Sequence, residues 1–309
     1  MRRIPHPISQ LAGYVTAVPT PFRDFEIDEA RFTAFCDWQI RHGISALVIC
    51  GTTGEASTLT PAEQARLVRL AVEVAHHRVP VIAGAGAAST NHAIDLARAA
   101  EREGADGVLA VTPYYVRPSQ EGLFRHFAAL HDAIGLPILL YDVPARTCST
   151  IEIETIVRLA ALPRIVGLKD ATGDHGRPPQ LRRQLGPEFR LFSGDDASAL
   201  SFVAQGGNGC ISVTSNVAPK LCIQMFDAWV RGDTVEAAML AALLAKVTRA
   251  LFAESNPVPV KCALELMGHM SASVRLPLCA ASEATRSQVA EAMTKLGIGG
   301  MGPRLRLVS

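Results

Sequence analysis

The sequence lacks an excess of charge of either sign, and it has no long hydrophobic run. Its 30 Lys and Arg residues nearly balance its 29 Asp and Glu residues, so the formal net charge is +1. Without a broad basic surface, we expect no nucleic-acid partner. No stretch approaches the roughly 18 apolar residues that a spanning helix requires, so we expect no membrane segment. Pro5 and Pro7 argue against a signal peptide at the N-terminus.

Several motifs of redox, cofactor and metal chemistry are also missing. The seven cysteines form no Cys-x-x-Cys pair and their number is odd, so we interpret them as reduced thiols of a cytoplasmic protein. The sequence has no P-loop and no Gly-x-Ser-x-Gly turn. No two histidines are four residues apart, the spacing that places two zinc ligands on one face of a helix. We therefore expect neither a metal nor a cofactor.

What the sequence does contain is a regular alternation of short apolar runs and amphipathic segments. Eight runs are typical of buried strands, and each is followed by a segment with helical periodicity. The predicted strands cover residues 13–19, 46–50, 79–83, 107–111, 137–141, 165–169, 190–193 and 210–213. The predicted helices that follow them cover residues 28–42, a segment capped by Thr60, 91–103, 120–133, 152–160, a segment after Pro178-Pro179, 195–205 and 219–231.

Eight β-then-α units over about 220 residues predict an α/β fold of the closed (β/α)8 TIM-barrel type. The alternative is an open doubly wound sheet, and the lack of a Gly-x-Gly-x-x-Gly motif after the first strand weakens it. Beyond Gly232 only helical segments remain, at residues 234–254, 260–267 and 282–296. We therefore predict a barrel over residues 1–232 and a C-terminal helical appendage over residues 233–309.

In such a barrel the active site lies at the C-terminal ends of the strands and in the loops that follow them. By this rule, six different units of the predicted barrel contribute candidate site residues. They are Thr52 and Thr53, Tyr114 and Tyr115, Tyr141 and Arg146, Lys169, Gly194, and Ile211. We expect these residues to converge on one mouth.

Lys169 is the most informative candidate because it ends an apolar strand. Burial disfavours the ammonium form of a lysine and makes the amine a nucleophile toward carbonyls, which predicts a Schiff base on a small oxo acid. The structural alternative is a lysine that extends to solvent at a strand end. With a Schiff base, Tyr141 would move protons and the Thr52-Thr53 turn would hold a carboxylate. Arg146 would bind a second carboxylate, although it also fits a surface ion pair.

Five motifs, in order, resemble those of the dihydrodipicolinate synthase family of pyruvate-dependent class I aldolases, to which N-acetylneuraminate lyase is related. They are Gly-Thr-Thr-Gly-Glu at 51–55, Thr-Pro-Tyr-Tyr at 112–115, Tyr-Asp-Val-Pro-Ala-Arg-Thr at 141–147, Gly-Leu-Lys-Asp-Ala-Thr-Gly at 167–173 and Ser-Gly-Asp-Asp-Ala at 193–197. Asn-Pro-Val-Pro-Val-Lys at 256–261 looks like the C-terminal motif of the family. The resemblance runs from about residue 13 to residue 296.

The resemblance implies a lyase that condenses pyruvate with L-aspartate 4-semialdehyde in lysine and diaminopimelate biosynthesis. It implies that Lys169 forms the Schiff base and that Tyr141, Thr52 and Tyr115 relay protons, Tyr115 across a dimer interface. It also implies that the substrates are bound by Thr53, Arg146, Gly194 and Ile211. The implied assembly is a homotetramer of two tight dimers that acts on small molecules.

Two other functions fit parts of the pattern. One is another pyruvate-dependent lyase or dehydratase that acts on a sugar acid or a 2-oxo acid adduct. The other is a pyruvate-binding sensor without turnover, which would not require a proton relay. Arg146-Thr147 after Val-Pro-Ala favours the synthase over the sugar-acid enzymes.

The sequence also departs from the family pattern. Asp142 stands where asparagine is usual, and Asp170 stands where glutamate is usual. We expect the extra carboxylate beside Tyr141 to alter the proton relay or the substrate preference. Positions that bind inhibitory lysine in sensitive members correspond here to His92, Ala88, Pro61 and Gln64. This set lacks a carboxylate for a cationic ligand, so we expect little inhibition by lysine.

Overall fold

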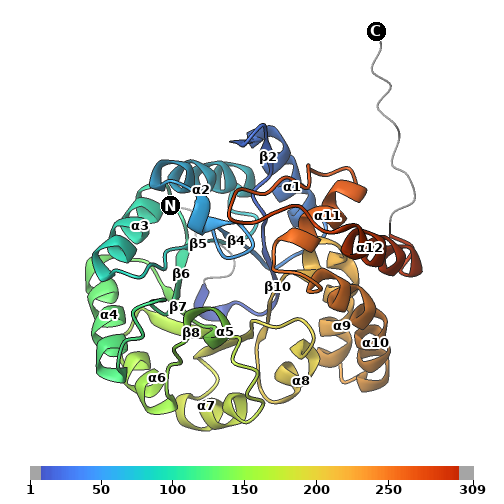
Figure 1. Cartoon of the computed structure of the whole chain (residues 1–309). Coiled ribbons are helices and arrows are strands. Elements are labelled where there is room, and N and C mark those ends of the chain that lie inside the picture. Colours follow the sequence, from blue (N-terminus) through green and yellow to red (C-terminus); the bar gives the residue numbers. More distant parts are fainter. Residues whose placement is uncertain (1–7, 299–309) are drawn as a thin grey trace.

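The computed structural model describes residues 8–298, which form a closed parallel barrel ringed by helices (Figure 1). The strands pair in the order β1-β10-β9-β8-β7-β6-β5-β4, and β4 returns to β1. They are β1 (Gly13–Ala17), β4 (Ala46–Ile49), β5 (Val81–Gly84), β6 (Gly107–Val111), β7 (Ile138–Asp142), β8 (Ile165–Asp170), β9 (Arg190–Ser193) and β10 (Gly209–Ser212). The predicted (β/α)8 barrel is confirmed, and the open sheet is wrong. The expectation drawn from Pro5 and Pro7 concerns residues outside the described range.

The outer helices alternate with the strands, as predicted. They are α1 (Glu29–Arg41), α2 (Pro61–Ala75), α3 (Thr90–Arg102), α4 (Gln120–Ala133), α6 (Ile153–Ala160), α7 (Arg177–Leu185), α8 (Ala199–Ala204) and α9 (Pro219–Val230). Local sequence explains several of their starts. Thr60 and Glu63 form a reciprocal capping box with Pro61 at the first position of α2, which satisfies amides that the helix itself leaves unbonded.

Two helix starts differ from the prediction. Helix α7 begins at Arg177, before the proline pair, because proline is tolerated in a first helical turn. Helix α8 begins only at Ala199, so Asp195 and Asp196 do not lie at its first position. Asp195 instead accepts hydrogen bonds from the backbone and hydroxyl of Ser198. Asp196 accepts from the backbone amides that lead into η3 (Thr214–Asn216), after β10.

Three further helices follow the barrel, on the side of the molecule where α9 lies (Figure 1). They are α10 (Thr234–Leu251), α11 (Val258–Leu266) and α12 (Glu283–Lys295). The sequence did not predict the small elements, which are η1 (Ile8–Gln10), the hairpin of β2 (Phe22–Arg23) and β3 (Glu26–Ile27), η2 (Ala56–Thr58), η3 and α5 (Pro144–Thr147). Among residues 8–298, no helix is both long and apolar enough to cross a membrane. The domain boundary at residue 232 stays a prediction.

Strand alternation divides the core into two layers and decides which side chains face the barrel axis. Successive strand residues point to opposite faces of a sheet. On β7, Leu139 and Tyr141 belong to the cluster inside the barrel, whereas Ile138 and Leu140 pack between the strands and the helices. The same alternation directs the side chain of Asp142, the last residue of β7, toward the helical layer.

Candidate active site

Lys169 and Tyr141 lie side by side at the C-terminal ends of neighbouring strands. They are register partners on β8 and β7, and each is only 7% exposed. The Lys169 Nζ atom lies 4.3 Å from the centre of the Tyr141 ring. The amine is therefore held against an aromatic face, close to a phenol that can exchange protons with a reacting group.

The other side of Lys169 is confined by Gly194, in the loop after β9. A Cβ atom at Gly194 would lie 3.2 Å from Lys169 Cε and 2.7 Å from Ala171 Cβ. Any larger residue would therefore force a shift near Ala171 and crowd the lysine side chain. Ile211, from β10, is buried in the same inner cluster as Tyr141. Gly194 thus lies close to Lys169, and Ile211 shares the inner cluster with Tyr141.

The turn after β4 carries the two predicted threonines. Thr52 and Tyr141 line the same cavity, which has a volume of about 380 Å³ and is large enough for a small organic acid. Thr53 is buried, and its Oγ1 accepts a hydrogen bond of 3.0 Å from Asn256 Nδ2. Arg146, on α5, is exposed and also lines the cavity, where it supplies a positive charge. Its Nη2 donates to the Asn256 carbonyl over 3.4 Å.

Tyr115 is placed differently from the other candidates. Its side chain is 93% exposed, and its backbone φ is +74°, in the left-handed region. It is not among the described residues that line the cavity, although its neighbour Tyr114 is. Four of the predicted site residues line the cavity, namely Thr52, Tyr114, Tyr141 and Arg146. Lys169 lies against Tyr141, but it is not among the described lining residues, and neither are Thr53, Gly194 and Ile211.

Comparison with known proteins identifies the family of this chain. The model of the dihydrodipicolinate synthetase family matches residues 10–296. The chain belongs to this family. A 4-hydroxy-tetrahydrodipicolinate synthase from Rhodospirillum centenum is 50% identical over 286 residues, which cover 93% of this chain and 98% of the relative.

Solved structures of the family superpose closely on this chain. The chloride-inhibited dihydrodipicolinate synthase of Acinetobacter baumannii, complexed with pyruvate, has a TM-score of 0.91 at 42% identity, covering 93% of this chain and 99% of that one. The Cyanidioschyzon merolae enzyme, with lysine bound, also has a TM-score of 0.91, at 36% identity, covering 93% of this chain and 98% of that one. The barrel and its appended helices are therefore common to these proteins.

One ion pair in this family member was not predicted from the sequence. Lys261 Nζ lies 2.7 Å from Glu55 Oε1, and both side chains are 0% exposed. Burial lowers the pKa of Lys261 to about 8, although the carboxylate of Glu55 acts in the opposite direction. Glu55 has a left-handed φ of +56° and belongs to the same turn as the two threonines. The pair therefore connects α11 to that turn. The sequence feature that could have indicated this pair is a lysine within the otherwise apolar stretch at residues 258–264.

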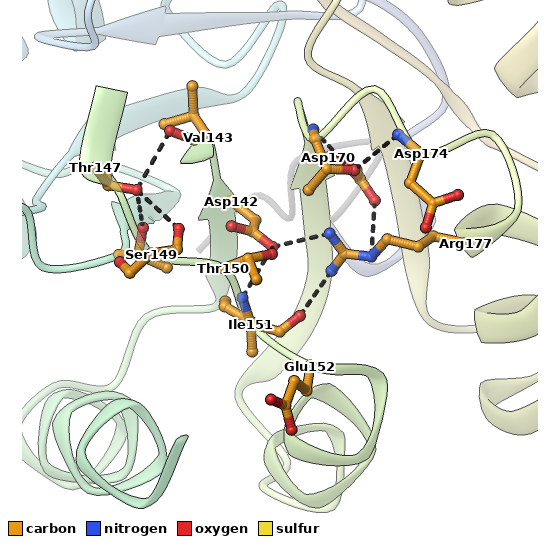
Figure 2. Close-up of polar contacts among 12 residues, drawn as sticks. Asp142, Val143, Thr147, Ser149, Thr150, Ile151, Glu152, Asp170, Asp174 and Arg177 are labelled. Carbon is orange, nitrogen blue, oxygen red and sulfur yellow. Dashed lines mark hydrogen bonds and ion pairs between the residues drawn. The ribbon is translucent and has the colours of Figure 1, made fainter. Parts of the chain in front are cut away.

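Asp142, which stands where asparagine is usual in the family, lies outside the inner layer of the barrel. The Asp142 side chain is fully buried in the outer layer, where its Oδ2 accepts hydrogen bonds from Arg177 and from the Ile151 backbone (Figure 2). Burial raises its pKa, and Arg177 opposes this effect. Asp142 and Tyr141 therefore face opposite sides of β7, because successive residues of a strand alternate between the faces of a sheet. The expected effect of Asp142 on the proton relay or the substrate preference stays a prediction.

Proposed function

We propose that Lys169 forms the Schiff base through which this enzyme, a lyase of the class I aldolase type, condenses pyruvate with L-aspartate 4-semialdehyde. The observation that supports this role is the buried amine of Lys169 against the ring of Tyr141, at the catalytic end of the barrel. A lysine amine can add to a carbonyl carbon and form an imine.

The proposed reaction assigns one step to each group of the site. The Lys169 amine adds to the ketone carbon of pyruvate, and water leaves as the imine forms. Loss of a methyl proton gives an enamine, whose carbon attacks the aldehyde of the second substrate. Tyr141, with Thr52, exchanges the protons of these steps, and Thr53 and the Gly194 region receive the pyruvate. Arg146 binds the carboxylate of the semialdehyde by its planar guanidinium.

The test combines trapping with turnover. The protein is incubated with pyruvate and borohydride, the adduct is mapped by mass spectrometry, and turnover is measured with pyruvate and aspartate semialdehyde. We expect one adduct, on Lys169, together with synthase turnover. An adduct elsewhere would contradict the role of Lys169. An adduct on Lys169 without turnover would favour a related aldolase acting on another aldehyde.

The free thiols of all seven cysteines agree with a reducing compartment, and we propose a cytoplasmic location.

We also propose that Tyr115 completes the site of a second copy, in a homotetramer of two tight dimers. Its exposure supports this role, since the side chain is open to a second copy and is not among the described residues that line its own cavity. Co-expressing Tyr115→Phe with Lys169→Met tests it. A mixed dimer would hold one site with both residues intact, so activity should recover to about a quarter of the wild-type value. If Tyr115 served its own subunit, the mixture would stay inactive.

The cavity supports the expectation of weak inhibition by lysine. His92 and Gln64 both line it, but Glu55 is the only carboxylate among its described lining residues, and Glu55 is already paired with Lys261. An ammonium ligand would therefore find no free carboxylate there. We expect initial rates to change little when lysine is added. Inhibition at the concentrations that affect sensitive members would contradict this prediction.

A further inference from the structure

Behind the active site, Arg177 lies between two buried carboxylates (Figure 2). Its Nη1 donates to Asp142 Oδ2 over 2.9 Å, and its Nε lies 3.5 Å from Asp170 Oδ2. Its Nη2 donates to the Ile151 carbonyl over 2.9 Å. A single guanidinium thus connects the last residue of β7, the last residue of β8 and the loop that follows α5.

All three charged side chains are withdrawn from water. The side chain of Asp142 is 0% exposed, that of Asp170 4% and that of Arg177 7%. Removing charges from water costs several kcal/mol per ion, so a buried ionic group is often no more stable than a well-packed apolar one. Stability alone therefore explains this cluster poorly. A role in fixing one arrangement of the strand ends explains it better.

The cluster sits one residue beyond the reacting groups. Tyr141 pairs with Lys169 in the sheet register, and Asp142 pairs with Asp170 directly after them. Because strand residues alternate between faces, the phenol and the amine point into the barrel while the two carboxylates point toward α7. Any relative shift of the ends of β7 and β8 would move both pairs together.

We propose that Arg177 is a positioning residue, which holds the ends of β7 and β8 through Asp142 and Asp170 and so sets the placement of Lys169 against Tyr141. This inference rests on the proposed roles of Lys169 and Tyr141. Hydrogen bonds around the carboxylates extend the same control to the catalytic loops. Asp142 Oδ2 also accepts from Thr150 and Ile151, and Asp170 Oδ1 accepts from the Thr172 backbone and hydroxyl.

Loss of the guanidinium would leave Asp142 and Asp170 buried without a shared cation. The two carboxylates would then repel each other across neighbouring strands, unless one of them took up a proton. Burial already raises the pKa of Asp142 while Arg177 is present. Either response changes the contacts that hold the strand ends at their present separation.

The test compares two arginines of the same helix. Arg177→Lys keeps the charge, but it replaces the three guanidinium nitrogens, which face Asp142, Asp170 and Ile151, by a single nitrogen. Arg182→Lys is the matched control, because Arg182 bonds to the carbonyls of Gly206 and Phe189 near the N-terminal ends of β9 and β10, away from the site. We expect Arg177→Lys to lower kcat and the rate of adduct trapping at saturating pyruvate by about 10- to 100-fold, with a smaller change in KM. Arg182→Lys should lower the thermal midpoint and leave kcat close to the wild-type value.

The inference is overturned if Arg177→Lys keeps the wild-type kcat and trapping rate, or if both variants lose kcat in proportion to their loss of stability. If Arg177→Lys does not fold, Asp170→Ala provides the same comparison, with an expected loss of about tenfold in kcat. A normal kcat in that variant would also overturn it. A wild-type protein that forms no adduct on Lys169 would instead contradict the proposed function itself. The two failures are therefore distinguishable.

Discussion

Replacing Lys169 with methionine is expected to lower kcat by roughly 10³-fold or more, the scale of losing a covalent nucleophile. Methionine has a similar length and suits the apolar surroundings, so the fold should persist. No pyruvate adduct should form under borohydride, and the thermal midpoint should stay near that of the wild-type protein. Turnover, trapping and thermal unfolding of the same preparation check these expectations.

The matched control is Lys220→Met, which changes an exposed lysine at the start of α9. It should retain both turnover and adduct formation on Lys169. A Lys169→Met variant with more than a few per cent of wild-type turnover would show that the imine is not formed on this residue, or that no imine is required. A Lys169→Met variant that works fully in cells would instead favour a sensor without turnover.

Replacing Lys261 with methionine is expected to cost about 3–5 kcal/mol of folding free energy, because Glu55 would be left as an unpaired buried charge. The thermal midpoint should fall by about 10 °C. The activity of the remaining folded protein should also fall, since Glu55 belongs to the turn that carries the two threonines. Urea denaturation and thermal scans measure the first effect, and kcat per folded protein measures the second.

A double variant separates the charge from the packing. Adding Glu55→Gln to Lys261→Met removes the unpaired charge but keeps an acceptor for the Arg275 backbone amide, which bonds to Glu55 Oε2 over 3.0 Å. We expect the double variant to regain about 1–2 kcal/mol relative to Lys261→Met. Lys246→Met, an exposed change on α10, controls for loss of a lysine. A single variant as stable as this control would show that the buried pair contributes little.

Much of the fold was predictable because its signals are local. Each barrel strand is a short apolar run, and helix caps such as Thr60 act within one turn of chain. The misplaced start of α8 has a different cause. The Asp196 carboxylate accepts bonds from amides more than a dozen residues away, after β10, and no local pattern indicates such a partner.

The candidate site likewise contains residues that the sequence predicted and partners that it did not. Lys169, Tyr141 and the Thr52-Thr53 turn were found from the rule that barrel strands deliver their last residues to one mouth. The side chains that hold these residues in place were not predicted from the sequence. Arg177 lies in a polar stretch that reads as an ordinary exposed helix start, and the pairing of Lys261 with Glu55 spans 206 residues. Such contacts depend on the closed barrel, so they become visible only in three dimensions.

The contacts of α11 and the loop before it have a consequence for how the enzyme is made. Thr53 and Glu55 emerge early from the ribosome, but Asn256 and Lys261, which bond to them, are synthesised about 200 residues later. A nascent chain that has already released all eight barrel strands still lacks the partners of this turn. During translation the barrel is thus complete before the active site is, and a chain truncated after β10 would keep Lys169 and Tyr141 but lose the groups that fix Thr53 and Glu55.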